Sequence, residues 1–456
     1  MYIEQIYTKC LAQGSYYIES DGEAVIIDPI RDIDIYIQKA TERKASIKYI
    51  FETHFHADFV SGHIDLAKKT GATIVYGPNA KTEYAVKIAS DMEEITVGDV
   101  SFTVLHTPGH TMESTCYLLK DHSGKDHAIF TGDTLFIGDV GRPDLAVKSD
   151  LTQDDLAGYL FESIQTKLLP LPDDVIVYPG HGAGSACGKN MSKETVSTIG
   201  DQRKNNYALQ HKTKDEFVQS ITCGLSKAPS YFSFDVKLNK EGYRSIDELR
   251  SQGSTPLSVE KFSSYAQSGA LIIDSRTPDE YEKGAIPGSY SVGLNGQYAV
   301  WAASLIPLDK DIILIANEHQ LADAIDRLAR VGFEQIKGYL KGGIDAWKDA
   351  GKSVQTVESI EPIEFAEMSK TRTILDVRKP GEFGTAHIKN AVHASLEELE
   401  HIAPTLTKSE PYLIHCAGGY RSMIAASILK QHGFDHVINV KGGFGMLKQD
   451  NRLEIV

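Results

Sequence analysis

Short runs of β-branched and aromatic residues alternate with turn residues over the first 120 positions of the chain. These runs are rich in Ile, Val, Tyr and Thr, and most of them end near Gly, Pro or Asp, which is typical of strands. The runs that we predict to be strands are residues 15–19, 24–28, 49–53, 73–76 and 101–106. Between them the pattern favours helices at residues 34–43 and 64–70. The alternation predicts an α/β arrangement.

The C-terminal part of the chain contains an internal repeat with a period of about 100 residues, which is too long for a solenoid. Ile273-Asp274-Ser275-Arg276 matches Leu375-Asp376-Val377-Arg378, and Lys341-Gly342-Gly343 matches Lys441-Gly442-Gly443. Each copy reads strand, loop, strand, loop, helix, which favours a small α/β domain with a parallel sheet. We therefore expect three domains, at residues 1–250, 256–354 and 358–456, with a linker at residues 251–256.

Composition narrows the classes of function. The 456 residues are 41% hydrophobic and 24% charged, and 47 basic residues face 62 acidic ones, for a net charge of −15. A chain this acidic is not expected to bind nucleic acid or an anionic membrane surface. There is no apolar run long enough for a membrane span and no export signal, and the five scattered cysteines form no disulfide framework, so we expect a cytoplasmic protein.

Histidine and aspartate residues follow several of the β-type runs. The motifs are His54-Phe55-His56-Ala57-Asp58, Pro108-Gly109-His110, Thr131-Gly132-Asp133 and Pro179-Gly180-His181. Imidazole and carboxylate ligands suit a borderline divalent metal, and glycine permits the tight turns and close approach that such a site needs. Four motifs of this kind predict one metal centre built from four strand ends.

These motifs resemble the metallo-β-lactamase superfamily over residues 1–205, which implies an αββα fold for the first domain. The chain departs from the dinuclear hydrolases of that superfamily at Phe59, where they carry a second adjacent histidine. The loss of one imidazole weakens the second metal site and favours a single ion. His63 is the nearest other imidazole, and we interpret it as a residue that starts a helix.

Within the superfamily, the His54–Asp58 segment, the His110 motif and Gly138-Asp139-Val140-Gly141-Arg142-Pro143-Asp144 resemble the persulfide dioxygenases. This resemblance implies one Fe(II) per chain, held by His54, His110 and Asp133, a facial triad that leaves positions open for O₂, substrate and water. His56 and Asp58 would then orient the ligands and polarise bound water, although His56 as a direct ligand stays open.

Two further residues are candidates for substrate binding near the metal. Arg142 could hold an anionic substrate tail bidentately, or it could form a structural ion pair with Asp144. Cys187, in a Gly-rich loop after His181, could bring a thiol to the pocket rim, or it could be a small buried residue.

The third domain carries a separate sulfur site. His415-Cys416-Ala417-Gly418-Gly419-Tyr420-Arg421-Ser422 follows an apolar strand at residues 412–414 and precedes a predicted helix at 422–431. Loop N–H groups and the helix dipole would stabilise a Cys416 thiolate, and Arg421 would add positive charge. Together with Asp376-Val377-Arg378 and Lys441-Gly442-Gly443, this loop resembles a rhodanese domain, and an inert buried Cys416 is the alternative.

The second domain keeps the repeat but not this loop. The aligned segment, Ile315-Ala316-Asn317-Glu318-His319-Gln320, has no thiol, glycine or arginine, and Glu318 would repel an anionic persulfide. We interpret this copy as a catalytically inactive rhodanese-like module that acts as a spacer or an interface, and we expect a homo-oligomer.

Taken together, the chain resembles fusions of a persulfide dioxygenase with a sulfurtransferase. The resemblance implies that Fe(II) and O₂ convert a small-molecule persulfide to sulfite, and that Cys416 then transfers a sulfane sulfur to sulfite to give thiosulfate, in sulfide detoxification. One alternative is a metal-dependent thioester hydrolase similar to glyoxalase II. A second, from another class, is a sulfur carrier or scaffold with a structural metal, although structural zinc sites usually have four ligands, often cysteines.

Overall fold

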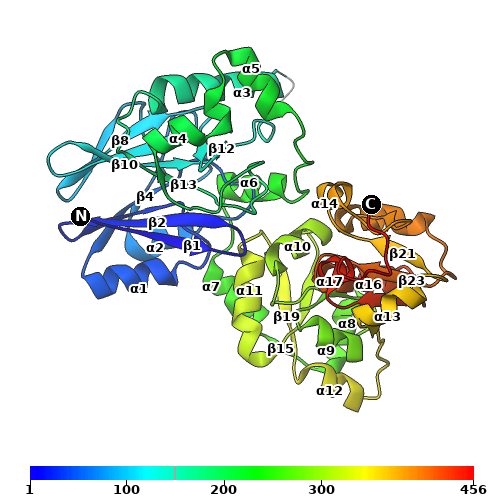
Figure 1. Ribbon diagram of the computed structural model, residues 1–456. Helices are drawn as coiled ribbons and strands as arrows, with labels where there is room; N and C mark the ends of the chain where they lie inside the picture. Colours follow the sequence, from blue (N-terminus) through cyan, green and yellow to red (C-terminus); the bar gives the residue numbers. More distant parts are fainter. Residues whose placement is uncertain (148–149) are drawn as a thin grey trace. The chain divides into compact units, whose positions relative to one another are not determined.

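The computed structural model describes residues 1–147 and 150–456 (Figure 1). The chain forms two compact units, which we describe separately. The first comprises Met1–Ile246 together with Ala329–Gly332, and the second comprises Asp247–Leu328 and Phe333–Val456. None of the helices formed by the described residues has the length and apolarity needed to span a bilayer.

Two six-stranded sheets form the centre of the first unit. The first sheet, in spatial order, consists of β1 (Tyr2–Thr8), β2 (Gln13–Ser20), β3 (Glu23–Ile27), β4 (Ser46–Phe51), β5 (Thr73–Tyr76) and β6 (Lys87–Ile88). The second consists of β14 (Ser197–Thr198), β13 (Ile176–Pro179), β10 (Asp126–Gly132), β9 (Thr115–Lys120), β8 (Val100–His106) and β7 (Glu94–Val97). The small hairpin of β11 (Leu135–Phe136) and β12 (Asp139–Val140) follows β10.

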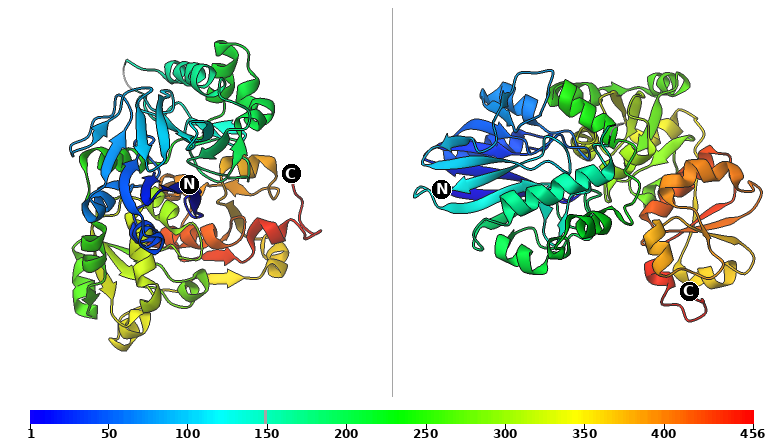
Figure 2. Two further views of the ribbon diagram at one scale, coloured as in Figure 1. Left: turned by 90° about the vertical axis from the view of Figure 1, so that its left-hand side faces the viewer. Right: turned by 90° about the horizontal axis from the view of Figure 1, so that it is seen from above.

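Helices cover the outer faces of these sheets, so the layers run αββα, as the resemblance to the metallo-β-lactamase superfamily implies (Figures 1 and 2). The helices of the first unit are α1 (Asp34–Arg43), α2 (His63–Thr70), α3 (Gln153–Ser163), α4 (Ile199–Asn205), α5 (Lys214–Thr222) and α6 (Phe232–Glu241), and α7 (Ile246–Gly253) leads into the second unit. A capping box between Thr152 and Asp155 starts α3, because each side chain accepts a backbone N–H that the first turn leaves unpaired.

Strand alternation explains how the layers bury their apolar surfaces. In β3, Val25 and Ile27 point into the core between the two sheets, whereas Ala24 and Ile26 face the core beneath α1 and α2. The opposite face of the second sheet packs against α3 and α5. Strands such as β3 and β9 are therefore buried on both faces, and the polar side chains of the predicted metal motifs lie at the strand ends.

The second unit contains two domains of the same topology, which we call the middle domain (residues 256–354) and the C-terminal domain (residues 358–456). The five-stranded sheet of the middle domain has the order β15 (Pro256–Leu257), β19 (Ile336–Leu340), β18 (Ile312–Ile315), β16 (Leu271–Asp274) and β17 (Ser289–Ser291). Its helices are α8 (Val259–Gln267), α9 (Pro278–Lys283), α10 (Tyr298–Leu305), α11 (Leu321–Ala329) and α12 (Gly343–Asp349).

The C-terminal domain repeats this order with β20 (Glu358–Ile360), β24 (Val437–Val440), β23 (Tyr412–His415), β21 (Thr373–Asp376) and β22 (Val392–His393). Its helices are α13 (Pro362–Met368), α14 (Pro380–Thr385), α15 (Leu399–Ile402), α16 (Tyr420–Gln431) and α17 (Gly443–Leu447). Figure 2 shows its sheet, in orange and red, between helices. All strand pairs in both domains are parallel, as the repeat pattern predicts.

Most of the predicted elements are confirmed, with two differences. The linker predicted at residues 251–256 is shorter in the structure, because residues 251–253 form the last turn of α7 and Pro256 begins β15. The sequence pattern also missed β1, which pairs with β2, and β6, which pairs with β5, together with β7 and β9, which both pair with β8. Helix α2 begins at His63, whose Nε2 lies 2.7 Å from the Tyr84 hydroxyl, so His63 is the helix-start residue that we expected.

Candidate metal centre and sulfur-transfer site

The four metal motifs of the first unit converge at the ends of its strands. His54 follows β4, His110 follows β8, Asp133 follows β10 and His181 follows β13. Gly180 lets two motifs approach closely, since a Cβ atom at this position would lie 2.7 Å from Asp133 Oδ1. All four metal-motif side chains are at least 98% buried.

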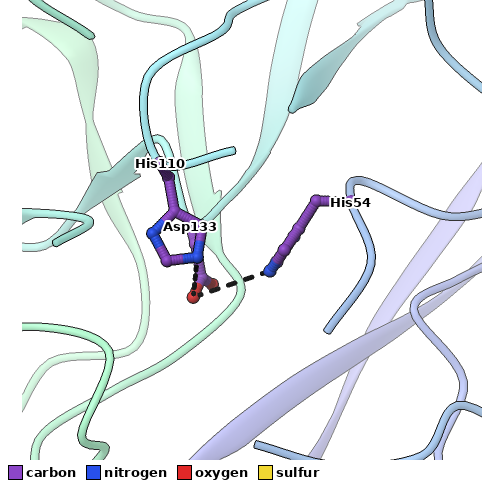
Figure 3. Close-up of side chains that lie close together, drawn as sticks. All are labelled: His54, His110 and Asp133. Carbon is purple, nitrogen blue, oxygen red and sulfur yellow. Dashed lines mark ion pairs between the residues drawn. The ribbon is translucent and has the colours of Figure 1, made fainter. Parts of the chain in front are cut away.

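His54, His110 and Asp133 form the innermost cluster (Figure 3). His54 Nε2 lies 3.8 Å and His110 Nε2 lies 3.5 Å from the same oxygen, Asp133 Oδ2. Their three ligand atoms lie within 4.8 Å of one another, so one ion could contact all three. Two imidazoles and one carboxylate in this arrangement are the ligand set of a facial triad.

Hydrogen bonds fix the tautomer of both imidazoles. The Thr53 hydroxyl donates its only proton to Asp28 Oδ2 at 2.8 Å, so it must accept a hydrogen bond from His54 Nδ1 at 2.9 Å. The carbonyl of Arg142 can only accept, so His110 Nδ1 donates to it at 2.8 Å. Both Nδ1 atoms therefore carry the proton, and both Nε2 lone pairs face Asp133, as a metal requires.

The unpaired polar atoms of this cluster fit a bound cation. Neither carboxylate oxygen of Asp133 has a hydrogen-bond partner among the described residues, although the side chain is buried. Burial and the neighbouring imidazoles of His56, His110 and His181 lower the pKa of His54 well below its usual value, which keeps it neutral. A buried carboxylate facing two neutral imidazoles lacks a positive partner, and a divalent ion would provide one.

His56, Asp58 and His181 form a second cluster beside the first. His181 Nε2 lies 3.4 Å from Asp58 Oδ2 and 3.5 Å from Asp133 Oδ1. Burial alone would lower the pKa of His181, but the Asp58 and Asp133 carboxylates outweigh it and raise the pKa. The second cluster therefore shares Asp133 with the first.

His56 is turned partly away from the first cluster. Its Nε2 lies 3.1 Å from Asp28 Oδ1 and 3.6 Å from Glu52 Oε2, and its ring lies against Phe59, with 4.3 Å between the ring centroids. Burial and the Asp28 carboxylate raise the pKa of Glu52 well above its usual value. Phe59 is fully buried where the dinuclear pattern places a histidine, so no imidazole from this position reaches the second cluster.

Cys187 lies at the metal site and not at an outer rim. Its Sγ, a carboxylate oxygen of Asp133 and a ring nitrogen of His181 lie within 4.8 Å of one another. Burial and the carboxylates of Asp58 and Asp133 raise the pKa of the thiol well above its usual value. Cys187 is therefore the buried residue of the second alternative, and its role in substrate binding stays a prediction.

Arg142 forms the structural ion pair that was one of its two predicted roles. Its guanidinium donates to both carboxylate oxygens of Asp144 at 2.6 and 2.7 Å, and also to the carbonyls of Ala186 and Ser226. The side chain is buried. Its role as a clamp for a substrate anion stays a prediction, and these contacts do not favour it, because the donors already have acceptors.

A cavity of about 150 Å³ adjoins His110. Phe55, Leu145 and Val236 give it apolar walls, and Glu113 and Lys240 give it charged ones. Lys240 Nζ lies 4.9 Å from the centroid of the Phe55 ring. Arg142 is not among the described residues that line the cavity. The positive charge of the described lining comes from Lys240.

The C-terminal domain presents Cys416 between β23 and α16. The backbone N–H of Gly419 donates to Cys416 Sγ at 3.1 Å, and Cys416 Sγ itself donates to Ser422 Oγ at 3.6 Å. Gly443 packs so closely behind the loop that a Cβ atom there would lie 2.3 Å from the Cys416 carbonyl oxygen, at a φ of +50° that favours glycine. The loop therefore curls around the sulfur, and it needs the two glycine motifs to do so.

Arg421 lies at the edge of this loop and is paired with a carboxylate. Its two terminal nitrogens donate to Glu382 Oε2 and Oε1 at 2.6 and 2.8 Å. This pair holds the pKa of Glu382 below its usual value. Arg421 thus contributes to the loop mouth as a member of an ion pair, and its role in catalysis stays a prediction.

Comparison with known proteins finds a matching family for both parts of the chain. A family model of the metallo-beta-lactamase superfamily matches residues 9–181, and a model of the rhodanese-like domain matches residues 258–350 and 361–449. The crystal structure of a metallo-beta-lactamase from Staphylococcus aureus subsp. aureus COL is 31% identical, with a TM-score of 0.66, and the match covers 75% of this chain and 98% of that one. The chain belongs to the metallo-beta-lactamase superfamily. Its middle and C-terminal domains are rhodanese-like.

Curated relatives match the metallo-beta-lactamase domain. A probable hydroxyacylglutathione hydrolase of Schizosaccharomyces pombe is 31% identical over 39% of this chain and 66% of its own length. The hydroxyacylglutathione hydrolase GloC of Haemophilus influenzae is 29% identical over 47% of this chain and all of its own length. The chain thus spans just under two thirds of the first relative, and both matches leave the rhodanese-like domains uncovered.

Sequence reasoning missed several residues that position the metallo-beta-lactamase site. Thr53 and Asp28 orient His54, and Glu52 faces His56, but no motif spacing marks these residues. Asp28 ends a predicted strand, which was a weak signal for a residue at the same edge as the ligands. The Arg142 backbone carbonyl could not be predicted at all, because its role does not depend on the side chain.

Proposed function

We propose that the metallo-beta-lactamase domain is a persulfide dioxygenase that binds one Fe(II) per chain through His54, His110 and Asp133. The observation that supports this most is the pair of Nε2 lone pairs aimed at one buried carboxylate that has no hydrogen-bond partner among the described residues. When bound in such a triad, Fe(II) activates O₂ and a thiolate at the positions that the ligands leave open.

The chain's own residues would bind and orient the substrate. The cavity beside His110 can hold the organic part of a persulfide against Phe55 and Leu145, and Lys240 can neutralise its negative charge. The overall reaction balances as R–S–SH + O₂ + H₂O → R–SH + SO₃²⁻ + 2 H⁺. The outer sulfur is oxidised, O₂ accepts the electrons, and the thiol leaves.

Cys416 would act on the sulfite formed in this way. The Cys416 thiolate attacks the outer sulfur of a second persulfide, the S–S bond breaks, and R–SH leaves with a proton. Sulfite then attacks the outer sulfur of the Cys416 persulfide, which forms thiosulfate and returns the thiolate. The Gly419 N–H, which already donates to Sγ, can stabilise the negative charge at each stage.

A thioester hydrolase is the second candidate. It is favoured by the second cluster, His56, Asp58 and His181, and by the hydroxyacylglutathione hydrolases among the relatives. Such an enzyme would use a metal-activated water. Phe59 and the contacts of His56 with Asp28 and Glu52 weigh against a second tightly bound ion.

Anaerobic purification with metal quantitation separates the two candidates. The dioxygenase predicts about one iron per chain and O₂ consumption with glutathione persulfide, with sulfite as the product. The hydrolase predicts two metals per chain and hydrolysis of S-lactoylglutathione without O₂ uptake. Two tightly bound metals, both required for activity, would overturn the proposal.

His110→Ala is the decisive variant. It removes one of the three ligands, so O₂ uptake and iron content should fall together. O₂ uptake should fall by at least about a hundredfold. Transfer of sulfur from thiosulfate to cyanide at Cys416 should persist. The matched control is His122→Ala, an exposed imidazole of the same domain, which should leave both activities unchanged.

A further inference from the structure

A cavity of about 740 Å³ opens over Cys416, and both rhodanese-like domains line it. The C-terminal domain contributes the Cys416 loop together with Lys379 and Lys441. The residues of the middle domain that line the cavity are Thr277, Pro278, Asp279, Asn295, Gly296, Gln297 and Trp301. The domain that lacks a catalytic cysteine thus forms a wall of the site that has one.

Direct contacts hold this wall in place. The Tyr420 hydroxyl, at the start of α16, donates to the Gly293 carbonyl at 2.7 Å. Gly296 lies so close to the Tyr420 ring that a Cβ atom there would be 2.5 Å from it. Lys441 Nζ lies 2.9 Å from Glu282 Oε1, and the Ser291 N–H donates to Ser427 Oγ at 3.0 Å. The wall is therefore fixed relative to the Cys416 loop.

The size of the cavity does not match inorganic sulfur anions. Sulfite and thiosulfate each have only a few heavy atoms, whereas pockets of roughly 300–1,000 Å³ hold ligands of drug size. A cavity of about 740 Å³ could hold an organic molecule whose sulfur reaches Cys416.

Polar groups without partners on the wall indicate the chemistry. The side-chain amides of Asn295 and Gln297 are exposed and make no hydrogen bond among the described residues. Trp301 is buried, and its indole N–H likewise makes no hydrogen bond among the described residues. Amides both donate and accept, as the groups of a peptide backbone do, and Lys379 on the opposite wall can pair with a carboxylate.

We propose that the middle domain is the recognition wall for a peptide-like, low-molecular-weight organic persulfide that donates its outer sulfur to Cys416. This inference rests on the sulfur transfer proposed above for Cys416, and it adds the chemical character of the group R and the domain that binds it. In the step, Cys416–S⁻ attacks the outer sulfur of R–S–SH, the S–S bond of the donor breaks, and the products are Cys416–S–S⁻ and R–SH. Asn295, Gln297 and Trp301 bind R and leave the sulfurs to the Cys416 loop.

The test compares an organic and an inorganic donor on the full chain without O₂, so that the metal site does not consume the persulfide. Glutathione persulfide with sulfite as acceptor measures the organic reaction, and thiosulfate with cyanide measures the inorganic one. The variants are Asn295→Ala with Gln297→Ala, and separately Trp301→Phe, which keeps the ring and removes the N–H. Gln267→Ala, an exposed amide of the middle domain outside the cavity lining, is the matched control.

The double variant should lower kcat/KM for glutathione persulfide about tenfold, mainly by raising KM. Trp301→Phe should lower it about threefold. Both variants act by removing hydrogen bonds to R. The thiosulfate reaction should stay within about twofold for all variants, which also shows that they are folded. Equal losses with both donors, or no loss with either, would overturn the inference. If the unaltered chain transfers no sulfur from thiosulfate to cyanide, the proposed function of Cys416 fails instead.

Discussion

The middle and C-terminal domains have the same sheet and differ in one loop. Their strands follow the same order, and a buried Asp–Arg pair lies at the end of the same strand in each. Arg276 Nη2 lies 2.5 Å from Asp274 Oδ2, and Arg378 Nη2 lies 2.6 Å from Asp376 Oδ2. Each guanidinium also donates to a carbonyl, of Gly284 or Ala386, at 2.9 Å. The scaffold is thus preserved in detail in the copy that lacks a thiol.

The two domains differ in the loop that follows the central strand of the sheet. After β18 come Ala316 and a short 3-10 helix at Glu318–Gln320, whereas after β23 come Cys416 and two glycines. Glu280 and Glu382 occupy the same place in their helices, but the first receives a weak hydrogen bond from Asn317 and the second an ion pair from Arg421. Packing therefore maintains the fold in both copies, and the chemistry depends on a few loop residues alone.

The largest expected effect is the loss of sulfur transfer when Cys416 is replaced. Cys416→Ser keeps the size of the side chain but removes the nucleophile, so thiosulfate–cyanide transfer should fall by at least about a thousandfold. With glutathione persulfide and O₂, uptake should persist and the product should change from thiosulfate to sulfite. Product analysis by ion chromatography checks both expectations.

Cys187→Ser is the matched control for this replacement, because Cys187 is also a buried thiol but lies in the metallo-beta-lactamase domain. It should leave thiosulfate–cyanide transfer unchanged. A Cys416→Ser variant that still makes thiosulfate enzymatically at the normal rate would contradict the role of Cys416.

The comparison also shows how far sequence reasoning reaches. The repeat around Asp274 and Asp376 predicted two parallel α/β domains, and the histidine motifs predicted the residues that meet at the metal centre, because both depend on strand ends. What the sequence did not predict is side-chain direction. The turn of His56 towards Asp28 and the middle-domain wall over Cys416 both depend on contacts between distant segments, and for Arg142 the sequence left open whether its guanidinium binds a substrate anion or pairs with Asp144.

The next largest effect concerns the scaffold that the two domains share. Arg378→Met leaves the Asp376 carboxylate buried without its partner, which should cost about 3–5 kcal/mol of stability. Arg276→Met should cost a similar amount in the middle domain. Because the chain has several domains, the measurement is hydrogen exchange of the segments around β16 and β21, followed by mass spectrometry.

The control for this pair of variants is an exposed ion pair. Lys389→Ala removes the contact between Lys389 and Glu454, both of which are exposed, and should cost no more than about 1 kcal/mol. If Arg276→Met and Arg378→Met cost no more than the control, the buried pairs do not stabilise the shared scaffold.

A smaller, pH-dependent effect should distinguish the domains. His415 occupies the position of Ile315, since each is the strand residue that faces the aspartate of the Asp–Arg pair in register. Burial lowers the pKa of His415 below the ordinary value of 6.5, and it outweighs the Asp376 carboxylate, which raises the pKa. The unfolded chain therefore binds a proton that the folded domain does not, and stability falls as the pH drops below 6.5.

Each unit of pKa difference should cost about 1.4 kcal/mol once the pH is below the folded-state value. Hydrogen exchange of β23 between pH 7 and pH 5 should show this loss, and exchange of β18, which has no histidine, should not. His415→Leu should remove the pH dependence of β23. A loss of the same size in both strands would point to another group.

The smallest expected effect is that of giving the middle domain a cysteine. Ala316→Cys places a thiol at the position of Cys416, and we test it in the Cys416→Ser background so that no other site contributes. The loop has no Gly-Gly turn to bring an N–H to the sulfur, and Glu318 adds a negative charge that opposes a thiolate and an anionic donor. Thiosulfate–cyanide transfer should therefore stay below about 1% of that of the unaltered chain.

Grafting the whole Cys416–Arg421 sequence in place of residues 316–321 should raise the rate above that of Ala316→Cys, because the graft supplies the N–H donor and the arginine next to Glu280. Full activity from Ala316→Cys alone would mean that the shared scaffold, and not the loop, provides the chemistry.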